Sequence, residues 1–272
     1  MRVTLKQSTF RRTVLSVGLV ASALVYAPHM ATAATITVTT LDDEIDTDGT
    51  CSLREAIQAA NTDSVVDTCA AGNGADTIQL PAGTITIALT NAAGNEASNQ
   101  TGDFDITSEV AIEPISTTST TTIDGGGDTI SDRIFDTSGS GTIQLSRLVL
   151  QNGKPTSGNG GVIRSKAGLS LTDVAIRNGD AACLMGGGIY HAPTSNTDAL
   201  TIDRSEISAN SAGDGGGIAI DATGDGANAS IVIKNTTFAG NMRGVSCTGN
   251  DGSALFVAGV PVQLDNVTAC SD

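Results

Sequence analysis

The chain has 272 residues and a formal net charge of −15, with 32 glycines, no tryptophan and only 3 % aromatic residues. A hydrophobic fraction of 39 % argues against wholesale disorder, and glycine without a period of three excludes collagen. So acidic a chain is a poor candidate for binding nucleic acid or anionic membranes, because phosphate groups would repel it. Abundant Val, Ile, Thr, Asp and Gly predict many short strands joined by tight turns.

Residues 1–33 have the pattern of a secretory signal peptide. Basic residues precede an apolar run from Val14 to Ala27, and a small-residue cleavage pattern follows at Ala31–Ala33. The run is too short to span a bilayer as a helix, and no later stretch is a candidate transmembrane segment. Export would remove 4 basic and no acidic residues, leaving 10 basic against 29 acidic residues and a net charge of −19.

Residues 34–75 are predicted to form an N-terminal cap. The segment Thr35–Thr39 alternates like an edge strand. Ser52-x-x-Glu55 is a capping box, which predicts a short helix from Leu53 to about Asn61. The apolar face of that helix, suited to cover the open first coil of a repeat structure, comprises Leu53, Ala56, Ile57 and Ala60.

An acidic run before this helix allows a calcium-loop interpretation. Glu44, Asp46, Asp48, Gly49 and Glu55 fall at positions 1, 3, 5, 6 and 12 of the calcium-binding loop pattern. The pattern departs from the usual one, because position 1 is Glu rather than Asp and a strand precedes it. The capping box also requires Glu55. Calcium as a cofactor and a solvated acidic turn therefore both remain open.

The cysteines fit an oxidising compartment. Cys51 and Cys69 flank the predicted helix, and a disulfide between them would stabilise the cap by about 3 kcal/mol. Cys183 and Cys247 follow equivalent asparagines two repeats apart, so their pairing would need long loops that bridge two coils. Cys270 is left without an assigned partner.

Internal repeats determine the expected architecture. Copies of one alternating pattern lie near residues 143–152, 169–178, 200–210, 231–241 and 262–272, with a Gly-Gly-x-Ile element between successive copies. A near-constant period without helical segments predicts a parallel β-solenoid over residues 76–272 with about one coil per repeat; a β-sandwich would not explain the period. The equivalent apolar positions, separated by 26, 31, 31 and 31 residues, are Leu145, Leu171, Ile202, Ile233 and Leu264.

Asparagines close the first four copies, at Asn152, Asn178, Asn210 and Asn241. We interpret them as a structural ladder stacked at one corner, in which each side-chain amide is satisfied by its neighbours. The fifth copy stops with the chain, which predicts an uncapped end that is either truncated or covered by a partner.

The segment Cys51-Ser-Leu-Arg-Glu-Ala-Ile57 resembles the segment that defines the CSLREA-domain proteins. The surroundings 75–84, 102–106 and 122–126 are similar to that family too, and Phe238-Ala-Gly-Asn241 resembles the repeats of polymorphic outer-membrane proteins. The resemblance implies a right-handed parallel β-helix with the pectin-lyase-like fold, exported to the cell surface or the medium. It implies no settled biochemical activity.

No catalytic constellation is evident in the sequence, although β-helices also host polysaccharide-cleaving enzymes. Asp173, Asp203 and Asp265 recur at repeat-equivalent places and are interpreted as a solvent-facing row, and His191 is expected in an exposed loop. We therefore expect a non-catalytic adhesion or interaction scaffold, secreted or associated with the cell surface or outer membrane. Its partner would be a glycan or a protein. The alternative is a polysaccharide-active lyase or glycosidase-like enzyme.

Overall fold

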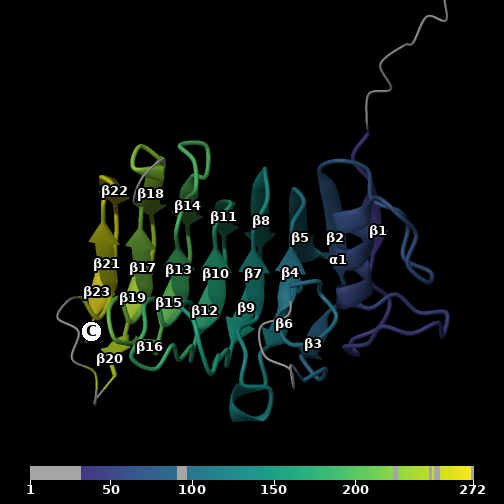
Figure 1. Ribbon diagram of the computed structural model, residues 1–272, viewed down its shortest axis with the longest axis horizontal. Helices are drawn as coiled ribbons and strands as arrows, with labels where there is room; N and C mark the ends of the chain where they lie inside the picture. The colour runs from purple at the N-terminus through teal and green to yellow at the C-terminus, as the bar shows by residue number, and fades with distance from the viewer. Residues whose placement is uncertain (1–31, 91–96, 223–225, 245–246, 248–251, 271–272) are drawn as a thin grey trace, which may run out of the picture. The chain divides into compact units, whose positions relative to one another are not determined.

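The computed structural model describes residues 32–90, 97–222, 226–244, 247 and 252–270. In these residues the chain winds through three parallel sheets, and each full coil adds one strand to each sheet in the order sheet 1, sheet 2, sheet 3. The predicted all-β parallel β-helix is confirmed (Figure 1). The predicted signal peptide lies outside the described residues apart from its last two positions.

Sheet 1 has eight strands in spatial order: β1 (Thr35–Thr37), β2 (Asp76–Leu80), β5 (Val110–Pro114), β8 (Thr142–Ser146), β11 (Gly168–Thr172), β14 (Leu200–Asp203), β18 (Ile231–Lys234) and β22 (Val262–Asp265). Sheet 2 has seven: β3 (Gly83–Thr86), β6 (Thr121–Asp124), β9 (Leu148–Gln151), β12 (Ala175–Arg177), β15 (Glu206–Ser208), β19 (Thr237–Ala239) and β23 (Thr268–Cys270).

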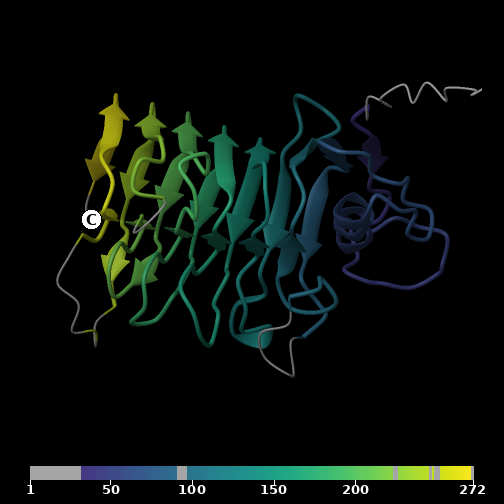
Figure 2. The ribbon, with the colours of Figure 1, turned by 45° about the horizontal axis from the view of Figure 1, so that its top comes forward.

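Sheet 3 has six strands: β4 (Phe104–Ile106), β7 (Phe135–Thr137), β10 (Ile163–Ser165), β13 (Ile189–His191), β17 (Ile218–Asp221) and β21 (Leu255–Ala258). A small two-stranded sheet joins β16 (Ser211–Ala212) to β20 (Met242–Arg243) in the connections between sheets 2 and 3. A 3-10 turn, η1, covers Gly127–Thr129 after β6. Figures 1 and 2 show the coils following one another from the helix at one end to β22 and β23 at the other.

The strand register confirms the alignment of the sequence repeats. The five equivalent apolar residues predicted from the sequence lie directly opposite one another in sheet 1, from Leu145 on β8 to Leu264 on β22. Two earlier coils, β2–β4 and β5–β7, continue the same row through Ile78 and Ile112. The stack therefore contains more coils than the sequence copies indicate.

Inward-facing Ile, Leu and Val residues form continuous ladders that make the core. Each of these side chains contributes roughly 1.5–3 kcal/mol when it leaves water. The aromatic contribution is small, and one pair, Phe104 and Phe135, has ring centroids 5.7 Å apart. The row ends at Leu264, which is 52 % exposed because no described strand lies beyond β22.

The cap is built from β1 and a single described α-helix, α1 (Leu53–Thr62). Both halves of the predicted capping box are present: Glu55 N donates to Ser52 Oγ at 3.1 Å, and Ser52 N donates to Glu55 Oε2 at 2.9 Å. The whole predicted apolar face is buried. Helix α1 contacts β1, β2 and β4 and so covers the end of the first coil (Figure 2).

A buried ion pair joins the cap to the first coil. Arg54 Nε lies 2.6 Å from Asp43 Oδ1, and neither side chain is exposed. The same guanidinium donates to the carbonyl oxygens of Gly102 at 2.7 Å and Asp103 at 3.2 Å, just before β4. It also lies 4.6 Å from the centroid of the Phe104 ring. The charges are fully hydrogen-bonded, which is the condition for such a pair to be tolerated in an interior.

We expect Arg54→Ala to lower the free energy of unfolding by about 3–5 kcal/mol, because the buried Asp43 would lose its opposite charge and keep only the backbone N–H groups of Ala88 and Leu89 as hydrogen-bond donors. Urea denaturation of the full chain measures this. Lys154→Ala, which removes an exposed ion pair with Asp128, is the control and should change stability little. Equal midpoints for the two variants would show that the buried pair does not hold the cap.

Candidate functional site

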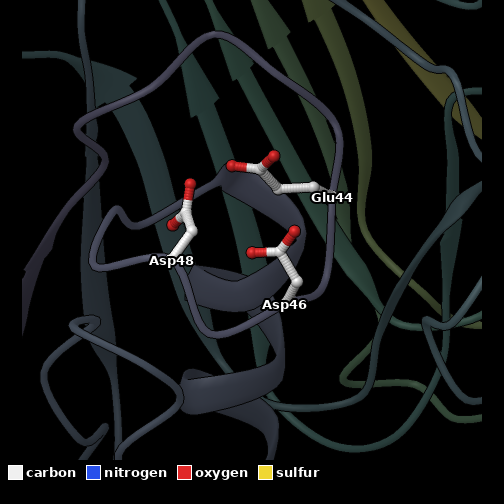
Figure 3. Close-up of side chains that lie close together, drawn as sticks. All are labelled: Glu44, Asp46 and Asp48. Carbon is white, nitrogen blue, oxygen red and sulfur yellow. The ribbon is translucent and has the colours of Figure 1, made fainter.

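The acidic loop before α1 brings together three of the four predicted calcium ligands. Carboxylate oxygens of Glu44, Asp46 and Asp48 lie within 4.8 Å of one another. Figure 3 shows their carboxylates turned toward one another inside the loop. The Thr50 hydroxyl lies within hydrogen-bond distance of Glu44 Oε1, at 3.1 Å, and of Asp48 Oδ1, at 2.9 Å, and its one proton can be donated to either carboxylate. Oxygen donors gathered in this way are the ligand type that calcium prefers.

Glu55, the fourth predicted ligand, does not join this cluster. It is 1 % exposed, and its Oε2 accepts the N–H of Ser52 in the capping box. Its Oε1 accepts the N–H of Asp46 at 3.2 Å. Both carboxylate oxygens of Glu55 are therefore used by backbone N–H groups, one in the capping box and one in the acidic loop. This side chain holds the loop backbone against the helix and does not face the other three carboxylates.

The three carboxylates differ electrostatically. Removal from water raises the pKa of Glu44, and the negative charges of Asp48 and Asp46 raise it further, against an opposing hydrogen bond from Thr50. The pKa of Asp48 is lowered, chiefly by hydrogen bonds from the Thr50 backbone N–H and hydroxyl. A cation in the loop would relieve the repulsion that acts on Glu44.

Both predicted disulfides are present. Cys51 pairs with Cys69 across the ends of α1, with Cα atoms 5.0 Å apart. Cys183 pairs with Cys247 at a Cα separation of 5.1 Å. The second bridge spans two coils, as the sequence requires, because both cysteines lie in long connections between sheets 2 and 3. Cys270 on β23 is a free, exposed thiol.

The four asparagines form two ladders rather than the predicted single one. Asn152 and Asn178 have left-handed backbones, with φ of 62° and 56°, and Asn178 Nδ2 donates to Asn152 Oδ1 at 3.3 Å. Asn210 and Asn241 lie one residue later in the register and are buried. Asn210 Nδ2 donates to Asn241 Oδ1 at 3.0 Å and to Ile176 O at 3.1 Å. The prediction was wrong in register because the later copies have one more residue before their asparagine.

His191 is buried rather than in an exposed loop, which corrects the sequence expectation. It occupies an inward position of β13 with no exposed surface, and its Nε2 lies 3.1 Å from Asp198 O. Its Nδ1 has no hydrogen-bond partner. Burial lowers the pKa of His191 to about 4, so the ring is neutral at physiological pH.

A second charged cluster, which was not predicted from the sequence, lies on β7 and β10 and just before β4 and β7 of sheet 3. Arg133 Nη1 lies 2.6 Å from Asp103 Oδ2 and 3.8 Å from Asp136 Oδ2, and Arg164 on β10 also pairs with Asp136. Burial raises the pKa of Asp103 to about 7, and the negative charges of Asp132 and Asp136 contribute, while Arg133 opposes the rise. Opposite charges about one coil apart in sequence are the signal that could have revealed this cluster.

Comparisons with known proteins give no relative for this chain: no protein-family model, no curated protein and no solved structure matches it. Among the described residues, no helix is long and apolar enough to cross a membrane. The chemistry of the residues is therefore the basis on which a function can be proposed.

Calcium binding at the acidic loop stays a prediction, with Glu44, Asp46 and Asp48 as donors. Titrating the full chain with calcium chloride should raise its Tm, because a cation bound only by the folded loop stabilises the folded state. Glu44→Gln should abolish the rise, and Glu109→Gln, at an exposed carboxylate outside the loop, should preserve it. An unchanged Tm at millimolar calcium, or the same rise in Glu44→Gln, would contradict the prediction.

We expect His191 to make the fold sensitive to acid. The unfolded chain takes up a proton at the ordinary pKa of 6.5, whereas the folded ring does so only near 4. The contribution of His191 to the free energy of unfolding therefore falls by about 3 kcal/mol as the pH drops through this window. His191→Gln lacks this titration. The free energy of unfolding of the variant minus that of the wild type should therefore increase as the pH falls from 6.5 to 4, and it should be constant above pH 7.5. A difference independent of pH would refute the assignment.

Proposed function

We propose that this chain is an exported, non-catalytic β-helix protein of the cell surface, outer membrane or surrounding medium that serves as an adhesion or interaction scaffold. The observation that carries the proposal is the enclosure of the two groups with large pKa shifts, Asp103 and His191. Asp103 is 2 % exposed and His191 is fully buried. Catalytic groups with shifted pKa values normally face a cleft that substrate can enter. These two shifts are more simply consequences of burial in a packed coil.

Export is supported by the cysteines and by the leader pattern. Disulfides persist in oxidising compartments, and the fold contains two of them. The pattern of residues 1–33 is that of a signal peptide.

We also propose that the chain is a member of the CSLREA-domain proteins that it resembles. In the segment 51–57, Cys51 forms a disulfide, Arg54 pairs with buried Asp43, and Glu55 completes the capping box. These roles attach a cap to the first coil. A motif with such roles supports a structural rather than a catalytic meaning of the resemblance.

One observation favours the alternative, a polysaccharide-active enzyme. Asp103 and Asp136 both lie within 4 Å of Arg133 Nη1. Two neighbouring carboxyl groups are the acid and base of many glycoside-cleaving sites. Asp103 forms an ion pair with Arg133, and Asp136 forms one with Arg164, which favours a structural role for both carboxylates.

The full chain, expressed with its leader in an exporting host, should appear outside the cytoplasm with Ala34 as its first residue. Incubated with pectate, alginate and neutral polysaccharides, it should release neither unsaturated products nor new reducing ends. Activity that disappears in Asp136→Asn would overturn the non-catalytic assignment and establish the enzyme. Retention of an uncleaved chain in the cytoplasm would overturn the assignment of an exported protein.

A further inference from the structure

A row of left-handed residues marks the corner between sheets 1 and 2. One residue per coil has a φ between 49° and 56°, and these residues are in register. The row comprises Arg147, Asp173, Arg204, Asn235 and Asn266. Asn and Asp tolerate this backbone, whereas other residues with a Cβ adopt it at a cost of about 1–2 kcal/mol. The two arginines therefore stand where the backbone disfavours them, which points to a role for their side chains.

Asp173 belongs to this corner row, whereas Asp203 and Asp265 occupy the preceding position, at the ends of β14 and β22. The row of three aspartates expected from the sequence is therefore divided between two positions. Asp203 lies beside the corner, with Arg204 Nη1 2.6 Å from its Oδ2. Charges of both signs consequently alternate along this edge of the coil.

A groove of about 890 Å³ follows the corner across four coils, from β8–β9 to β18–β19. Val149 and Ala175, which point outward from β9 and β12, line it together with Arg147, Arg204 and Glu206. The connection from β5 to β6, residues 115–120, is longer than the one- and two-residue corners of the later coils, and its residues 117–120 line one end of the groove.

The polar groups of the groove are balanced in charge and held by ion pairs. Arg204 Nε and Nη2 lie 2.9 and 3.2 Å from the two carboxylate oxygens of Asp173. Arg147 Nη2 lies 2.8 Å from Glu113 Oε2. The two lining arginines are matched by two lining carboxylates, Asp173 and Glu206, although the chain as a whole is strongly acidic. Threonine and serine hydroxyls from residues 117–120 complete the lining.

We propose that this groove binds a neutral oligosaccharide. The inference rests on the proposed function and gives the scaffold a binding surface and a class of partner. Sugar hydroxyls donate and accept hydrogen bonds at once, and fixed Arg–carboxylate pairs beside Thr and Ser hydroxyls offer both partners. A groove without net charge on an acidic chain does not attract a polyanion. Successive corner residues are separated by the strand spacing of about 4.8 Å, so they present a regular row of polar groups to an extended chain.

The test is calorimetric titration of the full chain with neutral hexasaccharides, namely those of cellulose, amylose, mannan and xylan, with hexagalacturonate as the anionic comparison. We expect at least one neutral hexasaccharide to bind and hexagalacturonate not to bind. Ala175→Leu fills the floor of the groove without adding charge or an aromatic ring, and it should weaken binding roughly tenfold. Ala111→Leu is the matched control, because Ala111 is a similarly half-buried residue that points outward from β5, and it should leave the affinity unchanged.

Unfolding midpoints of both leucine variants should equal that of the wild type, so that a loss of affinity reports on the groove. Failure of every neutral hexasaccharide to bind, equal affinity in Ala175→Leu, or binding of hexagalacturonate alone would each overturn the proposal. The proposed function is tested separately: a neutral hexasaccharide that binds in the groove and is cleaved would support the groove and overturn the non-catalytic scaffold. An exported chain that binds none of them would overturn the groove and leave the scaffold supported.

Discussion

Every coil of this protein must lie in register on the next, and the rest of the structure follows from that constraint. Parallel strands place each residue directly beside its equivalent in the neighbouring coil, so side chains meet their own counterparts along the whole stack. Apolar residues gain from this arrangement, because a ladder of Ile and Leu buries all its members except the last. A single coil would leave the same residues in water, so the repeats are stable only together.

The same constraint destabilises charged residues, because like charges at one position would repel one another from coil to coil. At several positions the chain meets it with opposite charges in successive coils, although Asp105 on β4 lies opposite Asp136 on β7. Asp173 faces Arg204 at the corner, and Asp136 faces Arg164 on sheet 3. At the start of the stack, where no earlier coil exists, Arg54 pairs instead with Asp43 of the cap. An acidic chain can thus stack its coils while most of its carboxylates remain in solvent.

The parts of the fold that repeat regularly could be predicted, and those that break the repeat could not. The 31-residue period revealed the coils from residue 143 onward, and the capping box revealed α1. The first two coils lie within the solenoid predicted for residues 76–272, but they were not recognised as repeat copies because their spacing differs and because residues 115–120 lengthen one corner. His191 was misplaced because a polar side chain at an inward position contradicts the apolar pattern. The role of Glu55 was ambiguous, since a capping box and a calcium loop require the same carboxylate.

The contrast between regular positions and positions that break the repeat indicates where functional groups can lie in a solenoid. Regular positions are fixed by stacking, since a change at any one of them must fit the residue above and the residue below. Side chains that point outward carry less of this demand. The long corner, through residues 117–120, and the left-handed Arg147 and Arg204 lie along one groove. Asn or Gly would fit the left-handed backbone at those corners more easily than arginine. The ion pairs of Arg147 with Glu113 and of Arg204 with Asp173 link neighbouring coils and hold fixed polar groups along the same groove.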